Sequence, residues 1–273
     1  MPEGHTIHRL ALDHRSRFEG QRVRASSPQG KFSAGAALVD GQVMTTAEAH
    51  GKHLFLGFGP DRDRWIHVHL GLFGKLDFGA GTAPPPTVRL RLATPDAYAD
   101  LRGPTTCALI TDAEKQAIHD RLGPDPLRPG DDPGRAWQRI SRSRTTIAAL
   151  LLDQKIIAGV GNVYRAEVLF RHSVDPYLPG RDLTRDQWDA LWADLVFLMG
   201  EGVRHNRIDT VRPEHLPEAM GRPPRVDDHG GEVYVYRRDR QGCHICGAEV
   251  RTAGLAARNL FWCPGCQPAT AVR

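Results

Sequence analysis

The sequence predicts an α+β protein made of two parts: an N-terminal helix with a β-sandwich, and a helical domain that ends in a four-cysteine hairpin. Three observations predict this class. Apolar residues recur at helical spacing in the first 18 residues, and an alternation with a period of two dominates residues 21–111. Helical spacing returns after a Pro-rich segment at 123–134, and four of the five cysteines follow residue 242.

The composition is that of a folded globular chain. Hydrophobic residues make up 40% of the 273 residues and charged residues 25%, which excludes a disordered protein. No apolar run approaches the ~18 residues of a membrane-spanning helix, and the first residues lack the pattern of a secretory signal, so we expect a cytoplasmic protein without a membrane partner. The net charge of +4 is compatible with a nucleic-acid partner but does not identify one.

The first predicted helix follows Pro2. Proline is tolerated in the first turn of a helix, and Glu3 is expected in the same turn, where a carboxylate complements the helix dipole. His5 and His8 are expected to be solvated, like most histidines on helix surfaces, and Gly20 ends the helix. The buried face is predicted to comprise Ile7, Leu10, Ala11, His14 and Phe18.

Short strands are predicted between residues 21 and 111. The segments 52–58, 65–70 and 88–92 read as strands, and clusters of Gly, Pro and Asp separate them. Several short strands with turns between them favour a β-sandwich or a barrel-like unit. Residues 79–86 are expected to form a Gly/Pro loop, and Cys107 is expected to be a buried hydrophobic residue.

A domain boundary is predicted at residues 123–134, because the four prolines of this segment exclude a continuous helix or a central strand. The expected division is an N-terminal domain at 1–122, a linker at 123–134, a helical domain at 135–231 and a metal-binding segment at 232–273. Helices are predicted at 147–154, 163–171 and 185–200, and a short strand at 232–238 after a second Pro-rich stretch at 212–225.

The two CxxC pairs predict one structural zinc ion. Each CxxC spacing lets two thiolates reach one ion from a tight turn, and two such turns close a tetrahedral site that has no open position for catalysis. A redox CxxC would not need two copies, and clustered cysteines in a cytosolic chain indicate metal rather than disulfides. The predicted ligands are Cys243, Cys246, Cys263 and Cys266. A hairpin between the pairs would expose Arg258, which by residue type alone is best interpreted as a solvated arginine.

A helix, a glycine-bearing turn and a second helix are predicted between residues 150 and 165. Gly159 and Gly161 allow the backbone to approach a phosphate closely, and the free amides of a helix that starts near Asn162 suit an anion. Lys155 adds a positive charge. An ordinary pair of helices with Asn162 as the N-cap explains this pattern equally well, so both interpretations stay open on these residues.

Taken together, these segments resemble the Fpg/Nei family of formamidopyrimidine-DNA glycosylases and endonuclease VIII enzymes. The resemblance runs through nearly the whole chain, in order: MPEG at 1–4, GKHL at 51–54, HLGLFG at 69–74, LGPD at 122–125, the stretch 153–165, and 258–267 with FWCPGCQ. It implies a helix-two-turns-helix at 153–165 and a terminal zinc finger. It also implies a monomeric, nucleoid-associated enzyme whose partner is double-stranded DNA with damaged bases or abasic sites.

The resemblance also implies roles for individual residues. Pro2, freed by removal of Met1, would be the nucleophile, with Glu3 as the acid/base beside it and Lys52 at a phosphate near the lesion. The residues that would contact or enter the DNA are Lys155, Asn162 and Arg258 at phosphates, Leu72 and Phe73 as a wedge in the base stack, and Arg102 as a further inserted residue. The amine of Pro2 would expel the damaged base, form a Schiff base with the sugar and cut the strand by β,δ-elimination.

The details of the match favour the endonuclease VIII branch. The element that is Arg-Phe-Gly in the Fpg branch reads LRGP at 101–104, so the wedge depends on Leu72 and Phe73, and oxidised pyrimidines are the expected substrates. The alternatives are a glycosylase that prefers 8-oxoguanine and formamidopyrimidine, a zinc-finger protein that binds damaged DNA without catalysis, and an unrelated enzyme with a proline base. The loops expected to contact the lesion, within 203–231, carry no pattern that identifies the base.

Overall fold

The structure, a computed structural model, describes residues 2–59, 63–226 and 231–269. The chain divides into two compact units, residues 1–121 and 122–273. The subdivision of the second unit into a helical domain and a terminal segment stays a prediction. No helix among these described residues combines the length and the apolarity that a bilayer-spanning segment needs.

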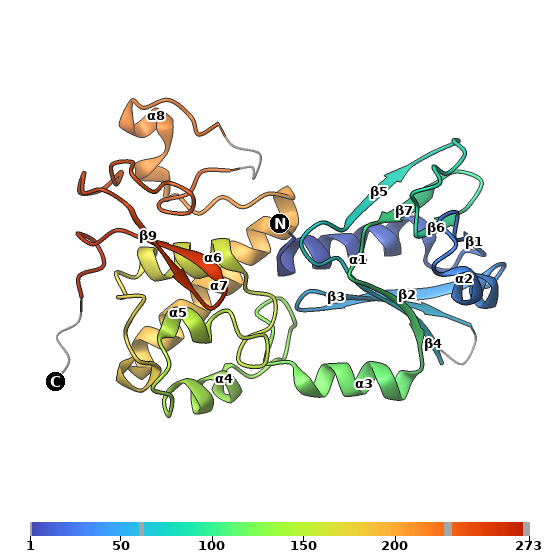
Figure 1. Ribbon diagram of the computed structural model, residues 1–273, viewed down its shortest axis with the longest axis horizontal. Helices are drawn as coiled ribbons and strands as arrows, with labels where there is room; N and C mark the ends of the chain where they lie inside the picture. Colours follow the sequence, from blue (N-terminus) through green and yellow to red (C-terminus); the bar gives the residue numbers. More distant parts are fainter. Residues whose placement is uncertain (1, 60–62, 227–230, 270–273) are drawn as a thin grey trace. The chain divides into compact units, whose positions relative to one another are not determined.

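The first unit is the predicted β-sandwich (Figure 1). Its described strands form two antiparallel four-stranded sheets, in the orders β1-β6-β7-β5 and β2-β3-β4-β8. The strands are β1 (Arg24–Ser26), β2 (Met44–His50), β3 (His53–Phe58), β4 (Arg64–His69), β5 (Lys75–Gly79), β6 (Leu90–Ala93), β7 (Tyr98–Arg102) and β8 (Thr106–Ile110). One hydrophobic core receives side chains from both sheets, so the sandwich is a single packed unit.

Helix α1 (Gly4–Phe18) packs against β2 and β3, and all of its predicted face is buried. Glu3 is the N-cap rather than a residue of the first turn, because its extended backbone places it just before the helix. Cys107 is half-buried against the core, and burial raises the pKa of its thiol to about 12. This residue therefore behaves as the expected apolar side chain.

Two helices of the first unit are absent from the sequence-based prediction. Helix α2 (Ser33–Val39) lies in the region predicted as strands, and only Ala36 and Val39 of this short Ala-rich segment are buried. Helix α3 (Asp112–Arg121) buries only Lys115 and Ile118. Neither helix buries enough apolar side chains to give a repeat that pattern analysis detects.

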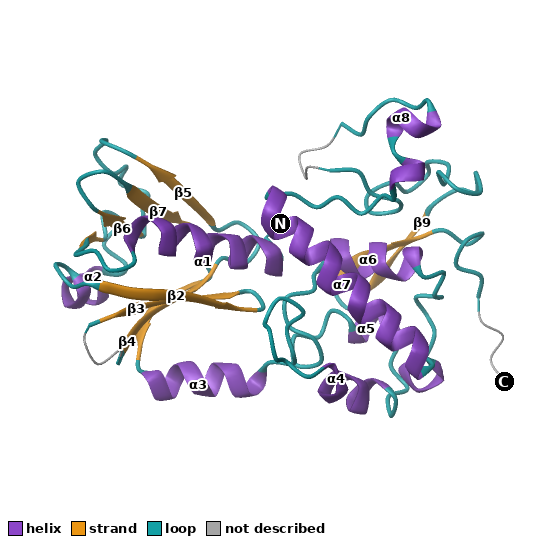
Figure 2. Cartoon of the chain, turned by 180° about the vertical axis from the view of Figure 1, so that it is seen from behind, coloured by secondary structure: helices purple, strands orange, loops and turns teal. Residues whose placement is uncertain are grey.

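The second unit is helical, and helix α6 lies at its centre, with residues 162–170 all buried. Figure 2 shows its helices together with the terminal hairpin of β9 and β10. The elements are α4 (Pro133–Ile140), α5 (Ile147–Leu150), α6 (Asn162–Arg171), α7 (Arg185–His205), α8 (Pro217–Met220), the 3₁₀ turns Gly180–Asp182 and Pro213–His215, β9 (Arg251–Leu255) and β10 (Arg258–Trp262).

The predicted helix ends in this unit need correction. Helix α5 stops at Leu150, because the chain turns at Asp153, whose side chain accepts a hydrogen bond from the N–H of Lys155. Helix α7 continues to His205 and ends at Asn206 in the left-handed conformation. Helix α4 was not predicted: it begins at the last proline of the linker, a position that helices tolerate.

The strand predicted at 232–238 is wrong. The segment forms turns, although its alternation of valine and tyrosine is typical of a strand. The reason is the buried carboxylate of Glu167, which accepts hydrogen bonds from the backbone N–H groups of Tyr234, Val235 and Tyr236 at 2.7, 2.8 and 2.9 Å. A side chain distant in the sequence thus replaces the partner strand.

Candidate functional site

The start of α1 carries the first two predicted site residues. Glu3 is fully buried, and its carbonyl accepts the N–H groups of Thr6 and Ile7, which begin the helix. Pro2 precedes it and is half-buried. Met1, whose removal would free the Pro2 amine, lies outside the described residues. A proline nitrogen and a buried carboxylate are therefore neighbours here, the pair of groups expected for a nucleophile and a proton carrier.

His5 departs from the expectation of a solvated side chain. Only 5% of its surface is exposed, and its ring is hydrogen-bonded to the hydroxyl of Thr6. Burial is the main cause that lowers the pKa of His5 to about 4, so the ring is neutral near pH 7. His8, on the same helix, is half-buried. The N-terminal site therefore contains a neutral imidazole close to Glu3 in the sequence.

Lys52 lies in the two-residue turn that joins β2 to β3. Gly51 takes the first central position with φ of +57°, the left-handed region that a type II′ hairpin turn requires there. Lys52 is half-buried. The pKa of His69 on β4 is lowered mainly by burial and, second, by the positive charge of Lys52. The turn thus holds a cation at the end of the sheet.

The predicted wedge residues are exposed in the turn after β4. Phe73 has 85% of its surface exposed and its neighbour Leu72 44%, so this turn exposes two consecutive large apolar side chains. Arg102, at the end of β7, is differently placed. Its guanidinium pairs with Asp77 and lies 3.9 Å from Asp100, so carboxylates hold it along the sheet.

The chain between α5 and α6 makes the predicted pair of turns. Gln154, which sequence reasoning did not select, organises them. Its side-chain amide donates to the carbonyls of Leu152 and Val160, and its oxygen accepts the N–H of Gly159. Gly159 has φ of +88°, which explains the glycine. Lys155 is exposed on these turns.

Asn162 is the first residue of α6 and does not cap it, since Gly161 is the N-cap. The N-cap interpretation of Asn162 is therefore wrong. Its side-chain amide instead donates to the carbonyl of Asn259 at 2.9 Å, and Arg165 donates to both Asn162 and Asn259. The fully buried Arg165 was also missed by sequence reasoning. These bonds bring the start of α6 next to the hairpin that carries Arg258.

Arg258 is exposed directly after the turn between β9 and β10. Ala256 and Ala257 form this turn with φ of +51° and +57°, both in the left-handed region that disfavours side chains. The hairpin therefore projects Arg258 as expected, on a strained turn. The hairpin thus places an exposed cationic group beside the start of α6, to which the bond between Asn162 and Asn259 ties it.

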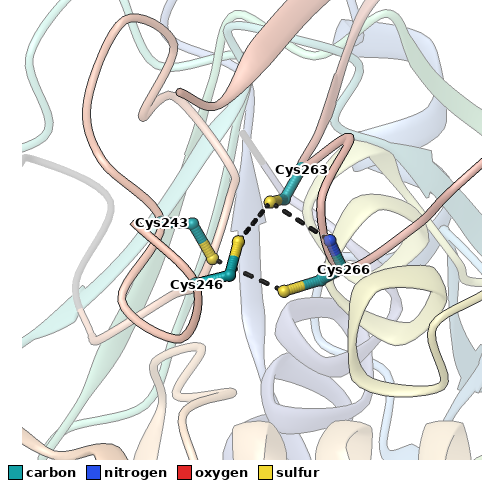
Figure 3. A group of neighbouring side chains, drawn as sticks. All are labelled: Cys243, Cys246, Cys263 and Cys266. Atoms are coloured by element: carbon teal, nitrogen blue, oxygen red, sulfur yellow. Dashed lines mark hydrogen bonds between the residues drawn. The ribbon is translucent and has the colours of Figure 1, made fainter. Parts of the chain in front are cut away.

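The four predicted metal ligands converge, as Figure 3 shows. Their Sγ atoms all lie within 4.8 Å of one another, with 3.8 Å between Cys243 and Cys266 and 3.4 Å between Cys246 and Cys263. A tetrahedron with metal–sulfur bonds of ~2.3 Å has edges of about 3.8 Å, so this geometry fits one ion. Gln267 links the cluster to the end of α6 by accepting the N–H of Cys263 and donating to the carbonyl of Val174.

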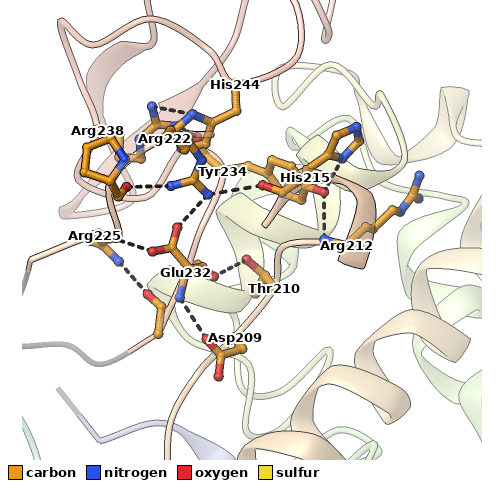
Figure 4. A network of polar contacts seen from close by, with 12 residues as sticks. Asp209, Thr210, Arg212, His215, Arg222, Arg225, Glu232, Tyr234, Arg238 and His244 are labelled. Carbon is orange, nitrogen blue, oxygen red and sulfur yellow. Dashed lines mark hydrogen bonds and ion pairs between the residues drawn. The ribbon is translucent and has the colours of Figure 1, made fainter. Parts of the chain in front are cut away.

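A polar network anchors the segment that follows α7, part of the region expected to contact the lesion (Figure 4). The carboxylate of Glu232 accepts hydrogen bonds from the guanidinium of Arg222 at 2.7 Å and from the backbone N–H of Arg225 at 2.6 Å. Burial opposes its ionisation, but these hydrogen bonds lower the pKa of Glu232. The N–H of Glu232 in turn donates to Asp209. Residues 227–230 of this region lie outside the described residues.

Comparisons with known proteins match both units. Residues 1–107 match the formamidopyrimidine-DNA glycosylase N-terminal domain, and residues 122–212 match the formamidopyrimidine-DNA glycosylase H2TH domain. Endonuclease 8 1 of Mycobacterium tuberculosis is 49% identical over 278 residues, covering 98% of this chain and 100% of the relative. Endonuclease 8 of Escherichia coli is 30% identical, with coverage of 98% and 100%.

More distant relatives share the same fold. Formamidopyrimidine-DNA glycosylase of Parasynechococcus marenigrum is 29% identical over 98% of this chain and 99% of the relative. Among solved structures, a complex between Lactococcus lactis Fpg and DNA that contains an abasic site superposes with a TM-score of 0.76 at 21% identity, covering 98% of this chain and 100% of that one.

Proposed function

Because the chain belongs to the family of formamidopyrimidine-DNA glycosylases and endonuclease VIII enzymes, we propose that it excises oxidised pyrimidines from double-stranded DNA through a Schiff base on Pro2 and then cuts the strand by β,δ-elimination. The family membership makes the chain a DNA glycosylase and AP lyase of base excision repair. The single observation that carries the proposed mechanism is the fully buried carboxylate of Glu3 directly after Pro2, at the start of α1.

The chemistry starts at the nitrogen of Pro2. An α-amine has an ordinary pKa of about 7.7–8.0, so part of it is neutral and nucleophilic near neutral pH. Its lone pair forms a bond to C1′ while the glycosidic C1′–N bond breaks, and the base leaves with a proton that Glu3 would supply. The Pro2 nitrogen then passes its proton to O4′ as the C1′–O4′ bond of the sugar breaks, and the product is an iminium between Pro2 and the opened sugar.

The iminium makes strand cleavage possible. It acidifies the proton on C2′, and loss of that proton breaks the C3′–O bond and releases one phosphate; a further elimination breaks the C5′–O bond and releases the other. Hydrolysis of the iminium then returns the free amine. Lys52 is proposed to hold a phosphate near the lesion during these steps, and its position in a short fixed turn suits that role.

Recognition is proposed to use both units of the chain. Leu72 and Phe73 would fill the space that the flipped nucleotide leaves in the stack, and their exposure supports this role. Lys155, Asn162 and Arg258 would bind backbone phosphates. One Zn²⁺ ion, held by the four cysteines, would fix the fold of the terminal hairpin without taking part in the reaction.

The preference for oxidised pyrimidines rests on the wedge. Arg102 is bound to Asp77 along the sheet, and no phenylalanine follows it, so the apolar side chains available for insertion are Leu72 and Phe73. The higher identity to endonuclease 8 than to formamidopyrimidine-DNA glycosylase supports the same choice. The second candidate, a preference for 8-oxoguanine and formamidopyrimidine, is an outcome of the test below.

The test measures single-turnover excision from duplexes that differ only in one base: thymine glycol, dihydrouracil, 8-oxoguanine or formamidopyrimidine. The proposal predicts the fastest excision of the two pyrimidines. It also predicts that Pro2→Gly lowers the excision rate at least about 100-fold, since glycine replaces the secondary amine held in the proline ring by a more mobile primary amine. Faster excision of the purine lesions would contradict the proposed substrate. Binding without excision of any lesion would favour a protein that recognises damage without catalysis.

A further inference from the structure

Five histidines that the proposed mechanism does not use gather on the outer face of the sheet β2-β3-β4-β8, under helix α3. They come from β2, β3, β4 and α3, and the register of the strands places them in neighbouring rows. We call this cluster the imidazole ladder; its members are His50, His53, His67, His69 and His119.

Two hydrogen bonds between rings tie the ladder together. The Nδ1 atoms of His50 and His119 lie 2.7 Å apart, and Nδ1 of His53 lies 2.8 Å from Nε2 of His67. Each bond needs one ring nitrogen that donates and one that carries no proton and accepts. Two imidazolium rings cannot form such a bond, so each pair requires a neutral ring.

Stacking extends the ladder through Phe55. The ring of Phe55 stacks on His67 at 5.1 Å and on His119 at 5.1 Å, with interplanar angles of 16° and 26°. His53 stacks on His67 at 5.1 Å and meets His69 at 4.9 Å. The rings therefore form one continuous packed layer, in which a displaced member disturbs its neighbours.

The ladder joins two turns that the proposed function assigns to DNA. His50 and His53 are the residues on either side of the Gly51–Lys52 turn and pair with each other across it. His69, the register partner of His53, is the last residue of β4, directly before the turn with Leu72 and Phe73. Contacts within the ladder thus fix the ends of both turns.

The charged groups around the ladder are mostly cations. The positive charge of Arg121 lowers the pKa of His53, and that of Lys52 lowers the pKa of His69. Lys115 of α3 lies over the ring of Trp65 and pairs with Glu48 at 2.5 Å. Burial is the largest cause that lowers the pKa of His53 to about 3 and of His67 to about 4, and neighbouring histidines lower both further. These rings are therefore neutral at physiological pH.

We propose that the imidazole ladder is a positioning device: its stacked and hydrogen-bonded rings hold the Lys52 turn and the turn that carries Leu72 and Phe73 in the arrangement that lesion processing needs. This inference rests on the proposed roles of Lys52, Leu72 and Phe73. The histidines act through those residues and touch no reacting atom. A purely apolar layer would pack as well, but it would lack the directional bonds that fix the ring positions at the turn.

The test uses variants that keep a stacked ring and remove the ring-to-ring hydrogen bond. His119→Phe frees His50 from its partner, His67→Phe frees His53, and Gln116→Ala on the exposed side of α3 is the matched control. Single-turnover strand cleavage is measured for each variant, for Lys52→Gln, and for the double variant of Lys52→Gln with His119→Phe, with melting temperature recorded as a check of the fold.

The inference predicts that His119→Phe and His67→Phe lose about 10-fold to 100-fold in rate, as expected for a displaced catalytic group, while Gln116→Ala stays at the wild-type rate. In the Lys52→Gln background, His119→Phe should cost much less than in the wild type, because the lost bond to His50 acts mainly through the Lys52 turn. Additive losses would overturn the positioning role. Wild-type activity of Lys52→Gln would instead contradict the proposed role of Lys52, and this inference would fall with it.

A spectroscopic measurement tests the ladder without reference to activity. The Cε1 resonances of the histidine rings, followed by NMR from pH 8 to 5, should show His53 and His67 without a protonation step near pH 6.5. His119→Phe should shift the resonance of His50, its lost partner. Ordinary titration of His53 and His67 near pH 6.5 would overturn the inference, whatever the role of Lys52 proves to be.

Discussion

Replacing Glu167 by glutamine is expected to destabilise the second unit strongly, although the two side chains have the same shape. One oxygen of Glu167 accepts the N–H groups of Val235 and Tyr236, and the other accepts the hydroxyl of Thr210 and the N–H of Tyr234. Glutamine keeps only one of these acceptors, so an NH₂ group must face two of the described donors.

The loss in the free energy of unfolding is set by the orientation of the glutamine amide that costs the least free energy. If the NH₂ group faces Thr210, that hydroxyl can rotate and accept from it, whereas the N–H of Tyr234 is left without an acceptor and meets a donor. A buried donor without a partner costs about 1–3 kcal/mol, and the donor–donor contact adds to this. We expect a loss of about 2–4 kcal/mol, which lowers the melting temperature by roughly 5–15 °C.

Two assays check this magnitude. Denaturation of the metal-loaded protein gives the change in the free energy of unfolding, and hydrogen exchange of the amides in 234–236 reports on the segment itself. Glu218→Gln, on the exposed side of α8, is the control and should change stability by less than about 0.5 kcal/mol. The reasoning is refuted if Glu167→Gln matches this control in both assays.

Four further outcomes are expected. Cys263→Ser should lower the bound metal well below one ion per chain and loosen the terminal hairpin, because structural metal binding supplies folding free energy; full retention of metal would contradict the four-cysteine site. The free energy of unfolding should fall between pH 6.5 and 4, since the unfolded chain protonates His14 at its ordinary pKa of 6.5 whereas burial lowers the folded value to about 4. At pH 5 the free energy of unfolding should be about 2 kcal/mol lower from His14 alone, and equal stability at pH 5 and 7 would contradict a lowered pKa of this histidine. Ala257→Gly should raise the melting temperature by relieving about 1 kcal/mol of strain at φ +57°; a lower value would count against a strained turn. Arg258→Ala should weaken duplex binding and reduce the slope of log affinity against log salt by about 0.9, while an unchanged slope would show that Arg258 contacts no phosphate.

Local patterns predicted much of this fold. The buried face of α1 follows from the spacing of Ile7, Leu10 and Phe18, and the structure confirms each of these positions. The convergence of the cysteines follows from the two CxxC spacings, because a tight turn fixes where each pair of thiolates points. Both predictions succeed because the relevant partners are close in the sequence.

The failures arise where a distant group decides the local structure. Residues 232–238 have a strand-like alternation, but Glu167 takes their backbone donors. Asn162 is of a residue type that favours the N-cap position, yet its amide donates a hydrogen bond to the carbonyl of Asn259 on the terminal hairpin. The buried Arg165 donates to the same carbonyl. The local sequence around residues 232–238 and around Asn162 contains no pattern that predicts these long-range contacts.

The covalent mechanism on Pro2 can be tested by borohydride trapping of the protein from which Met1 has been removed, on duplexes with thymine glycol, dihydrouracil, 8-oxoguanine or an abasic site. Reduction converts an iminium into a stable bond, and peptide mass spectrometry then locates it. We expect a covalent adduct at Pro2 that is strongest with the pyrimidine lesions and the abasic site, and whose yield falls strongly in Pro2→Gly. An adduct at another residue, or none on any substrate while DNA binding persists, would contradict the proposed mechanism.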